Sequence, residues 1–403
     1  MKRNILFVDD EPNILQGLRR MLRPMRDKWD MHFAASGEEA LELMTRVSMD
    51  AVVSDMRMPG MDGPEFLRRV MRDHPDAVRF ALSGYSDKQL VERSIAPTHQ
   101  YLTKPCDEKK LIQSLEDAMN ARAFISNKAV LDKIARIEHL PVLPRAYVRI
   151  TDELSKGDPS PRAVGEIVAE DVGLTANLLK LVNSAYFGLA RPIAAPQQAV
   201  IVLGVNVIRS VILSLHVFKS FETSLEQSFS LSKLWAHCMR TASIARGIAK
   251  FEGLAKEEAD NAYIAALLHD VGKLLLNAQC QSECKDIYAE VRESNRLVAE
   301  VEAEVMGLTH AQVGAYLLGL WGLPPAVVNA VARHHAEDPE PGGLCAASVA
   351  YFANMLDHDV FIFNTHYARP QFSEERLAGI GGPEVVARWR EAVVALGISE
   401  EGA

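Results

Sequence analysis

The sequence has no apolar run that is both long enough and free enough of polar residues to cross a membrane. Its most apolar long window, residues 199–218, contains Asn206, Arg209 and His216, so we interpret it as a buried helix of a folded domain. The first residues lead into a strand rather than into the long apolar core of a signal peptide. We therefore expect a cytoplasmic protein with no membrane span.

Cysteine is scarce, with five residues scattered along a chain of 403. An odd, scattered set in a chain of this length is typical of reduced cytosolic thiols. Cys280 and Cys284 lie one helical turn apart, as metal or redox pairs can. No second pair of cysteines accompanies them, so we do not interpret them as a metal site.

An excess of positive charge is also absent. Lys and Arg number 44 against 53 Asp and Glu, which gives a formal net charge of −9 at pH 7. This balance argues against a nucleic-acid-binding surface along the whole chain, and no helical pattern concentrates Lys and Arg as a recognition helix does. What the chain does have is 48% apolar residues in a length that suggests two or three domains.

Short apolar runs alternate with helical patterns in the N-terminal third. Runs over residues 5–8, 32–35, 51–54, 79–82 and 100–103 predict buried strands. Helical periodicity lies between them, for example over residues 12–22 and 66–71, and Ser36 and Asp107 are candidate helix caps. The alternation predicts an α/β fold with a doubly wound five-stranded parallel sheet.

Polar side chains follow four of these runs, and the carboxyl ends of parallel strands meet at one edge of a sheet. The residues are Asp9, Asp10, Asp55, Ser83 and Lys104. Adjacent carboxylates repel each other unless a cation joins them, and Mg²⁺ prefers oxygen ligands. The set predicts phosphoryl transfer to Asp55, with Mg²⁺ on Asp10 and Asp55. Lys104 and the Ser83 hydroxyl would bind the acyl phosphate that forms.

Residues 1–122 resemble the receiver domain of two-component response regulators. The matching residues are Asp9-Asp10, Asp55 with the loop 58–63, Ser83-Gly84 and Lys104-Pro105. The resemblance implies that a sensor histidine kinase phosphorylates Asp55, and that Ser83 and Tyr101 are switch residues. The implied Mg²⁺ site consists of Asp9, Asp10, Asp55 and the carbonyl group of Arg57. Residues 96–99 depart from the family, which often has a Gly-Ala pair there.

Residues 111–140 form a long helical pattern with few breakers. We interpret residues 123–140 as a linker helix that continues the last helix of the receiver. Such a helix either transmits a shift from the phosphorylation site or acts as a simple spacer, and a homodimer is an expectation that rests on it. Pro141 and Pro144 then mark a boundary, because proline blocks a helix.

The chain after residue 145 is helical almost throughout, with a break predicted over residues 171–175, and shows no strand-rich or repeat pattern. We expect an all-α domain over residues 141–340 and a helical extension over residues 341–403 that completes the bundle. Imidazole and carboxylate side chains on its predicted helices could ligate Fe, Mn, Ni or Zn. They are His237, His269, Asp270, His310, His334 and His335. A bundle that gathers them inward could hold one or two metals.

The segment from about residue 135 to 340 resembles the HDOD domain, a relative of the HD phosphohydrolases. The motifs are EDVGLT at 170–175, LLKLVNSAY at 178–186, LWAH at 234–237, LLHDVGKL at 267–274, WGLP at 321–324 and HH at 334–335. A receiver followed by an HDOD domain is a known layout of bacterial response regulators. HDOD domains are generally regarded as regulatory, which implies a switch that acts on downstream signalling proteins.

An enzyme is the alternative, namely a phosphorylation-gated metal phosphodiesterase or phosphohydrolase that acts on a nucleotide or a cyclic dinucleotide. Lys273 supports it, because the HD superfamily often has a phosphate-binding base one turn beyond the aspartate. Two features oppose it. Asn354 occupies the best position for the last aspartate of the superfamily, and the HD-GYP signature does not follow His335. The sequence therefore leaves catalysis open.

Overall fold

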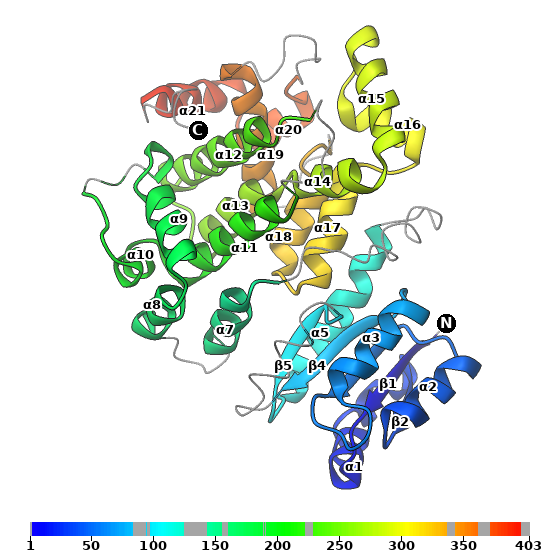
Figure 1. Ribbon diagram of the computed structural model, residues 1–403. Helices are drawn as coiled ribbons and strands as arrows, with labels where there is room; N and C mark the ends of the chain where they lie inside the picture. The colour runs from blue at the N-terminus through cyan, green and yellow to red at the C-terminus, as the bar shows by residue number, and fades with distance from the viewer. Residues whose placement is uncertain are drawn as a thin grey trace. The chain divides into compact units, whose positions relative to one another are not determined.

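The computed structural model describes residues 2–83, 94, 97–124, 143–154, 160–187, 189, 191–221, 229–336, 343–361 and 371–395. The chain divides into two compact units. The first consists of Met1–Val148 and Leu318–Gly322, and the second of Arg149–Leu317 and Leu323–Ala403. The first unit is built on a β-sheet, and the second is helical (Figure 1).

One parallel sheet organises the first unit. Its strands are β1 (Arg3–Val8), β2 (Trp29–Ala34), β3 (Ala51–Asp55), β4 (Val78–Ser83) and β5 (Gln100–Thr103). The five strands lie in the order β2-β1-β3-β4-β5, so the predicted doubly wound sheet is confirmed. Leu6 in β1 and Val52 in β3 are fully buried, as expected for strands covered on both faces. The carboxyl ends of β1, β3, β4 and β5 meet at one edge.

Helices connect these strands. They are α1 (Pro12–Met21), α2 (Gly37–Arg46), α3 (Gly63–Asp73) and α5 (Glu108–Ala121), with 3-10 turns η1 (Arg23–Asp27) and η2 (Arg122–Phe124). Helices α2, α3 and α5 begin at side-chain caps. Ser36, Asp62 and Asp107 each accept a hydrogen bond from the backbone N–H three residues later. Two of these caps were predicted. The predicted linker helix lies outside the described residues from residue 125 to its end.

Gly63 allows the loop after β3 to turn closely beneath Asp55. Its N–H donates to the Met56 carbonyl oxygen at 3.1 Å. A Cβ atom here would lie 2.2 Å from the carbonyl oxygen of Asp55, so no other residue fits without a backbone shift. The start of α3 is therefore fixed against the end of β3, and the backbone that carries Asp55 is fixed with it.

The second unit is helical throughout its described residues. Its helices are α7 (Arg145–Leu154), which includes the division point, α8 (Pro161–Ala169), α9 (Val172–Val182), α10 (Pro196–Leu203), α11 (Val205–Phe221), α12 (Leu231–Phe251), α13 (Lys256–Leu268), α14 (Val271–Gln279), α15 (Gln281–Ser294), α16 (Val298–Met306), α17 (His310–Leu320), α18 (Pro325–Ala332), α19 (Ala346–Val360), α20 (Glu374–Gly379) and α21 (Pro383–Ala395), with one 3-10 turn, η3 (Ala185–Phe187). The predicted all-α region is confirmed.

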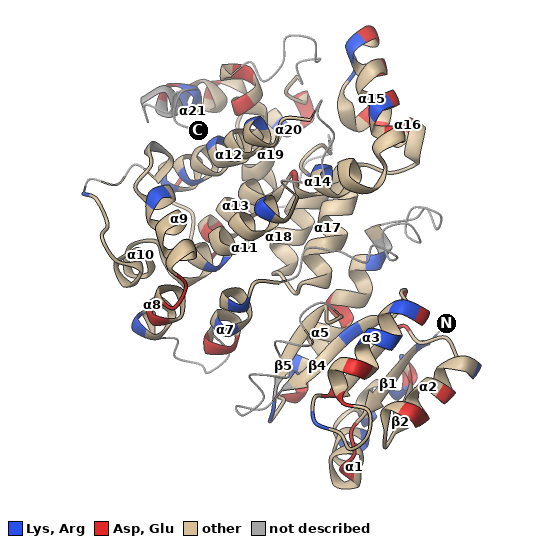
Figure 2. Ribbon diagram, in the orientation of Figure 1, with Lys and Arg blue, Asp and Glu red and all other residues tan. Residues whose placement is uncertain are grey.

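The core of this unit lies around α13, which packs against α12, α18 and α19. Leu267 and Leu268 at the end of α13 are fully buried. Helices α17 and α18 contain no Lys, Arg, Asp or Glu, as the uncoloured ribbons of Figure 2 show. A helix without a polar face belongs in a core. Polar side chains that enter such a core need partners, because burying an unpaired polar group costs free energy.

The most apolar window of the sequence is broken into α10 and α11 at Gly204, whose φ of 88° favours glycine. Most of α11 is buried, but Ile201 and Val202 of α10 are 71% and 57% exposed, so the prediction of a buried helix over residues 199–218 is wrong for the α10 part. Of the helices described, none alone is long and apolar enough to span a membrane. Only α10 and α11 together pass that test, and they are bent by 120°.

Single side-chain hydrogen bonds fix the start of α9 and connect α21 to α12. The break expected over residues 171–175 is wrong, because the Asp171 carboxylate caps α9 by accepting the Leu174 N–H at 2.9 Å. At the tail, Trp389 of α21 is 1% exposed and donates to Glu252 at 2.8 Å. This bond joins α21 to the end of α12.

Candidate functional site

The first cluster lies at the carboxyl edge of the sheet. Asp9 follows β1, Asp55 ends β3 and Lys104 follows β5. The Lys104 ammonium lies 2.8 Å from Asp9 Oδ2 and 2.5 Å from Asp55 Oδ1. Both carboxylates are buried, with 1% and 7% of the residue exposed. One cation therefore bridges two buried anions at the strand ends.

Asp10 adds a third carboxylate to this cluster. One oxygen of each of Asp9, Asp10 and Asp55 can be chosen so that all three lie within 4.8 Å of one another. The other oxygens are partly occupied, since Asp9 accepts the Glu11 N–H at 2.9 Å and Asp55 accepts the Arg57 N–H at 3.1 Å. Three carboxylates against one ammonium leave negative charge in excess, and this donor set fits a hard divalent cation such as Mg²⁺.

Electrostatics in the cluster favour a cation. Burial raises the pKa of Asp55, and the charge of Asp9 adds to this, although Lys104 acts in the opposite direction. Burial works against the charge of Lys104, but hydrogen bonds with Asp55 and Asp9 outweigh it and raise the pKa of the ammonium. Lys104 stays charged, and Asp55 carries a charge that its surroundings only partly offset.

Two further predicted residues lie beside this cluster in the sheet. Ser83 is the last residue of β4 and pairs with Thr103, and its side chain lies outside the described atoms, as does residue 84. The Tyr101 hydroxyl lies 2.8 Å from the Ser94 hydroxyl, and its ring packs against the core of the first unit. The structure thus places Tyr101 in an inward position with a hydrogen-bonded hydroxyl.

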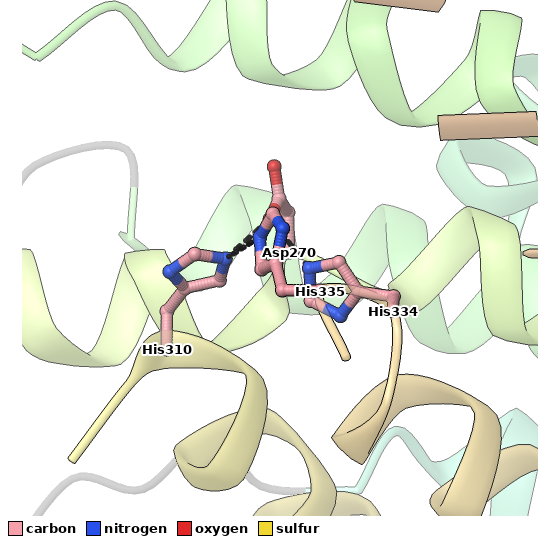
Figure 3. A group of neighbouring side chains, drawn as sticks. All are labelled: Asp270, His310, His334 and His335. Atoms are coloured by element: carbon pink, nitrogen blue, oxygen red, sulfur yellow. Dashed lines mark hydrogen bonds and ion pairs between the residues drawn. The ribbon is translucent and has the colours of Figure 1, made fainter. Parts of the chain in front are cut away.

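The second cluster lies inside the helical unit and contains all six predicted ligands. His237 comes from α12, His269 and Asp270 join α13 to α14, His310 begins α17, and His334 and His335 follow α18. They form two groups that share Asp270: one with His237 and His269, the other with His310, His334 and His335. Figure 3 shows the second group, with the side chains turned toward one another.

Asp270 lies between the two groups, and each of its oxygens faces one of them. Oδ2 is 3.6 Å from His237 Nε2 and 3.4 Å from His269 Nε2. Oδ1 is 3.2 Å from His310 Nε2 and 3.7 Å from His334 Nε2. An aspartate in this position can bridge two cations.

The opposite ring nitrogens determine which atoms face Asp270. Nδ1 of His269 and of His334 each lie 2.7 Å from a backbone carbonyl oxygen, and Nδ1 of His237 and of His310 each lie 2.6 Å from a carboxylate oxygen. These partners only accept, so Nδ1 carries the hydrogen and Nε2 of the neutral ring has a lone pair. The cluster therefore points imidazole lone pairs at a carboxylate.

Such an arrangement is unfavourable without a proton or a metal ion in the middle. Nε2 of His237 and Nε2 of His269 are 3.0 Å apart, and Nε2 of His310 and Nε2 of His335 are 2.9 Å apart. Nε2 of His334 is buried without a hydrogen-bond partner. Imidazole and carboxylate donors that converge in this way fit Fe, Mn, Ni or Zn.

Asp270 is held in its charged form. Burial opposes its charge, yet the charges of His269 and Lys273 and the hydrogen bonds of His269 and His310 hold the pKa of Asp270 well below its ordinary value. Lys273 donates to Asp270 at 2.7 Å. Burial alone would lower the pKa of His310, but the charge of Glu302 and the hydrogen bonds with Asp270 and Glu302 raise it. The bridging carboxylate is thus ionised at neutral pH.

Most of the surrounding imidazoles are kept neutral. Burial lowers the pKa of His237, although Asp357 acts against this. Burial also lowers the pKa of His335 well below its ordinary value, and takes the pKa of His334 to about 3. A neutral imidazole is the form that ligates a metal.

Sequence reasoning missed four residues of this cluster: Arg240, Glu302, Asp357 and His358. Asp357 and His358 follow Asn354 by three and four residues on α19, so the helical period could have found them once α19 was placed. Asn354 itself is buried, and its side-chain oxygen has no hydrogen-bond partner. Glu302 gives no such signal, because nothing in its spacing connects α16 to the histidines.

Comparison with known proteins identifies both units. The family model of the response regulator receiver domain matches residues 5–116, and that of the HDOD domain matches residues 140–337. An uncharacterized protein of Treponema pallidum (strain Nichols) is 29% identical over 223 residues, which are 55% of this chain and 42% of that protein. The hydrogenase transcriptional regulatory protein HoxA of Cupriavidus necator is 32% identical over 130 residues, 32% of this chain and 26% of that protein.

The chain thus spans less than half the length of either relative. Among solved structures, an HDOD domain protein with unknown function from Geobacter sulfurreducens covers 72% of this chain and 98% of its own. Its TM-score is 0.53 at 24% identity, which is a likeness of fold. The chain therefore belongs to the response regulators in which an N-terminal receiver domain is followed by an HDOD domain.

Proposed function

We propose that phosphorylation of Asp55 by a sensor histidine kinase switches the HDOD domain of this protein. The observation that carries the proposal is the cluster of Asp9, Asp10, Asp55 and Lys104 at one edge of the sheet. A carboxylate that must accept a phosphoryl group needs a cation for the incoming oxygens and a donor for the product. The cluster offers carboxylates for the first and Lys104 for the second.

The chain's own residues account for the transfer step. A carboxylate oxygen of Asp55 forms a bond to phosphorus as the phosphorus–nitrogen bond of the kinase phosphohistidine breaks. Lys104, which now bridges Asp9 and Asp55, is placed to bind an oxygen of the acyl phosphate. Asp9, Asp10, Asp55 and the Arg57 carbonyl would hold Mg²⁺, which neutralises phosphoryl charge when bound.

Labelling of the full chain with acetyl phosphate and Mg²⁺ tests this step. Asp55→Asn should abolish the acid-stable mass increase of one phosphoryl group per chain. Asp50→Asn is the matched control, because Asp50 precedes β3 at its other end, where it accepts the Asn4 N–H at 2.8 Å. Undiminished labelling of Asp55→Asn would refute the assigned phosphoacceptor.

For the output, we propose that the HDOD domain acts by binding downstream signalling proteins. The support is the family match over residues 140–337, since HDOD domains are regarded as regulatory. Asn354, in place of the last aspartate of the HD phosphohydrolases, agrees with a regulatory role. Affinity capture with the full chain, with and without phosphorylation of Asp55, tests this output. If the same proteins are bound with and without phosphorylation of Asp55, the result would count against this output.

A second candidate is a metal-dependent phosphohydrolase, and the lone pairs that converge on Asp270 favour it. The group of His237, His269 and Asp270 offers three ligands, the number that a catalytic zinc site takes from the protein. A bound metal would activate water for attack on a phosphate ester. Lys273 could bind the phosphate only by giving up part of its bond to Asp270.

Elemental analysis of the purified chain separates the two candidates. Two metal equivalents, lost in His269→Ala and kept in the control His74→Ala, would favour the enzyme. His74 caps α3 in the first unit, far along the chain from the cluster. Absence of metal from the wild type would favour a binding module.

A further inference from the structure

We propose that Glu302 and Asp357 are positioning residues that prepare the histidine cluster for cations. Each carboxylate lies behind one histidine, on the side away from Asp270, and each of the two ligand groups contains one such histidine. The inference rests on the metal site proposed above. It assigns a role to two buried acids that neither the family match nor the sequence motifs explain.

Glu302 of α16 contacts His310 through two donors. Its Oε2 atom lies 2.6 Å from His310 Nδ1 and 2.8 Å from the His310 backbone nitrogen. Glu302 is 3% exposed, so both bonds are shielded from water. The carboxylate thereby fixes the tautomer and the orientation of the ring, and Nε2 is directed at Asp270.

Asp357 of α19 does the same for His237 in the other group. Its Oδ2 atom lies 2.6 Å from His237 Nδ1, and Asp357 is fully buried. Arg240, one turn beyond His237 on α12, donates to both oxygens at 2.7 and 3.0 Å. The guanidinium keeps Asp357 ionised and holds it in place.

A polar core without metal would not need these charges. His269 and His334 are oriented just as well by neutral carbonyl oxygens at 2.7 Å. Glu302 and Asp357 add two anions close to the ionised Asp270, and repulsion between them costs free energy. Lys273 and Arg240 are bonded to Asp270 and Asp357, whereas the described partner of Glu302 is the imidazole of His310. The negative charge of Glu302 is therefore offset either by a proton on His310 or by a cation bound in the cluster.

A carboxylate behind an imidazole also makes it a stronger ligand, because it raises the electron density at the opposite nitrogen. Losing such a partner typically weakens metal binding 10–100-fold. The effect should come from charge rather than from shape, and this distinguishes a positioning residue from a purely structural one.

Glu302→Gln in the full chain tests the inference, because the amide oxygen can still accept the His310 Nδ1 hydrogen while the charge is lost. Mn²⁺ is the probe, with excess Mg²⁺ present to occupy the carboxylates of the receiver and free Mn²⁺ measured by electron paramagnetic resonance. We expect the dissociation constant to rise roughly 10–100-fold. The melting temperature without metal should stay the same or increase, whereas loss of a structural bond would lower it.

Two further proteins make the outcome decisive. Glu258→Gln is the matched control, since Glu258 accepts the Ala346 N–H at 2.9 Å and lies on α13 well before His269. The double variant Asp357→Asn, Arg240→Met removes both charges behind His237 and should show the same loss of affinity if Glu302→Gln does not fold. Wild-type affinity in a folded variant overturns the positioning role alone. A wild type that binds no Mn²⁺ overturns the metal site itself.

Discussion

Asp55 and Lys104 carry opposite charges at one buried edge of the sheet, but Asp9 adds a second negative charge beside the same ammonium group. Asp9 and Asp55 both contact the single ammonium group, and burial still raises the pKa of Asp55. The ionised form of Asp55 therefore costs free energy in the folded protein as long as no cation is bound. Residues that are needed for catalysis or binding often lower the stability of the folded protein in this way.

We expect Asp55→Asn to be more stable than the wild type at pH 7.5 with a chelator present. The gain should be below about 1 kcal/mol, because water screens part of the interaction. A carboxyl group whose pKa is raised by folding contributes stability below its ordinary value of 3.8, and loses that contribution as the pH rises through the folded value. The advantage of the variant should thus shrink as the pH falls toward 4.

Thermal unfolding of both proteins between pH 4 and pH 7.5 measures this difference. Asp50→Asn again serves as the control at the other end of β3, where the carboxylate bonds to the Asn4 N–H. A wild type that is the more stable protein at pH 7.5 without metal would contradict the expected cost of ionising Asp55.

At the residue scale, the two clusters differ in how far the sequence predicts them. Asp9, Asp55 and Lys104 come together because parallel strands bring their ends to one edge, whatever the loops do. Glu302 and Asp357 meet their histidines only through the packing of α16 and α19. Helical periodicity shows which face of a helix is buried but not which helix it packs against. The contacts of Glu302 and Asp357 with the histidines therefore could not be predicted from the sequence.

At the element scale, α14 and α17 approach each other through two glycines. A Cβ atom on Gly272 would lie 2.0 Å from the His310 carbonyl oxygen and 2.7 Å from the Gly314 nitrogen. Gly272 follows Asp270 by two residues, and His310 begins α17. The close approach therefore sets the distance between Asp270 and His310.

Gly272→Ala should destabilise the helical unit by roughly 2 kcal/mol or more, because its methyl group would overlap backbone atoms. It should also weaken Mn²⁺ binding by moving His310 away from Asp270. Gly173→Ala in α9 is the control, since its closest contact would be Asp171 at 3.4 Å, and it should gain up to about 1 kcal/mol. Urea unfolding compares them. Equal stability of Gly272→Ala and the wild type would show that the helices separate freely.

Local chemistry explains which elements the sequence predicted. Strands β3 and β5 are short apolar runs that end at a charged residue or a proline, and the structure has them at the expected places. The start of α9 was misplaced because it depends on one side-chain bond from Asp171. Gly173 lies within the predicted break, but glycine costs a helix only about 1 kcal/mol, which a cap can offset.

At the scale of the whole molecule, the described residues of the two units form candidate cation sites of different chemistry. One consists of carboxylates, and the other consists mainly of imidazoles around one carboxylate. Mg²⁺ prefers oxygen ligands, whereas imidazole suits transition metals. Each ion should therefore act on its own unit.

Mg²⁺ should stabilise the receiver domain and leave the HDOD domain unchanged. At one hundred times the dissociation constant, a ligand of the folded state adds about 2.7 kcal/mol. In scanning calorimetry of the full chain, Mg²⁺ should shift one transition in the wild type and in His269→Ala, and most of this shift should be lost in Asp55→Asn. A shift of equal size in all three proteins would place Mg²⁺ elsewhere.

The order of the two domains and their fold classes could be predicted from the sequence. Short apolar runs alternate with helical patterns in the N-terminal third, whereas helical patterns alone follow residue 145. The linker helix was predicted from residues that now lie outside the described part. The homodimer that was expected from that helix therefore stays a prediction. Light scattering in both phosphorylation states measures it directly.

The histidines and Asp270 come from helices that are far apart in the chain, and they meet at a single point. A coordination sphere tolerates displacements of only a few tenths of an ångström. A shift of any one of α12, α13, α17 or α18 relative to the others would therefore release the ion. The fraction of chains with an ion bound at this centre would thus report how closely these helices pack. A spectroscopic signal from the bound ion could therefore follow conformational changes of the HDOD domain in real time.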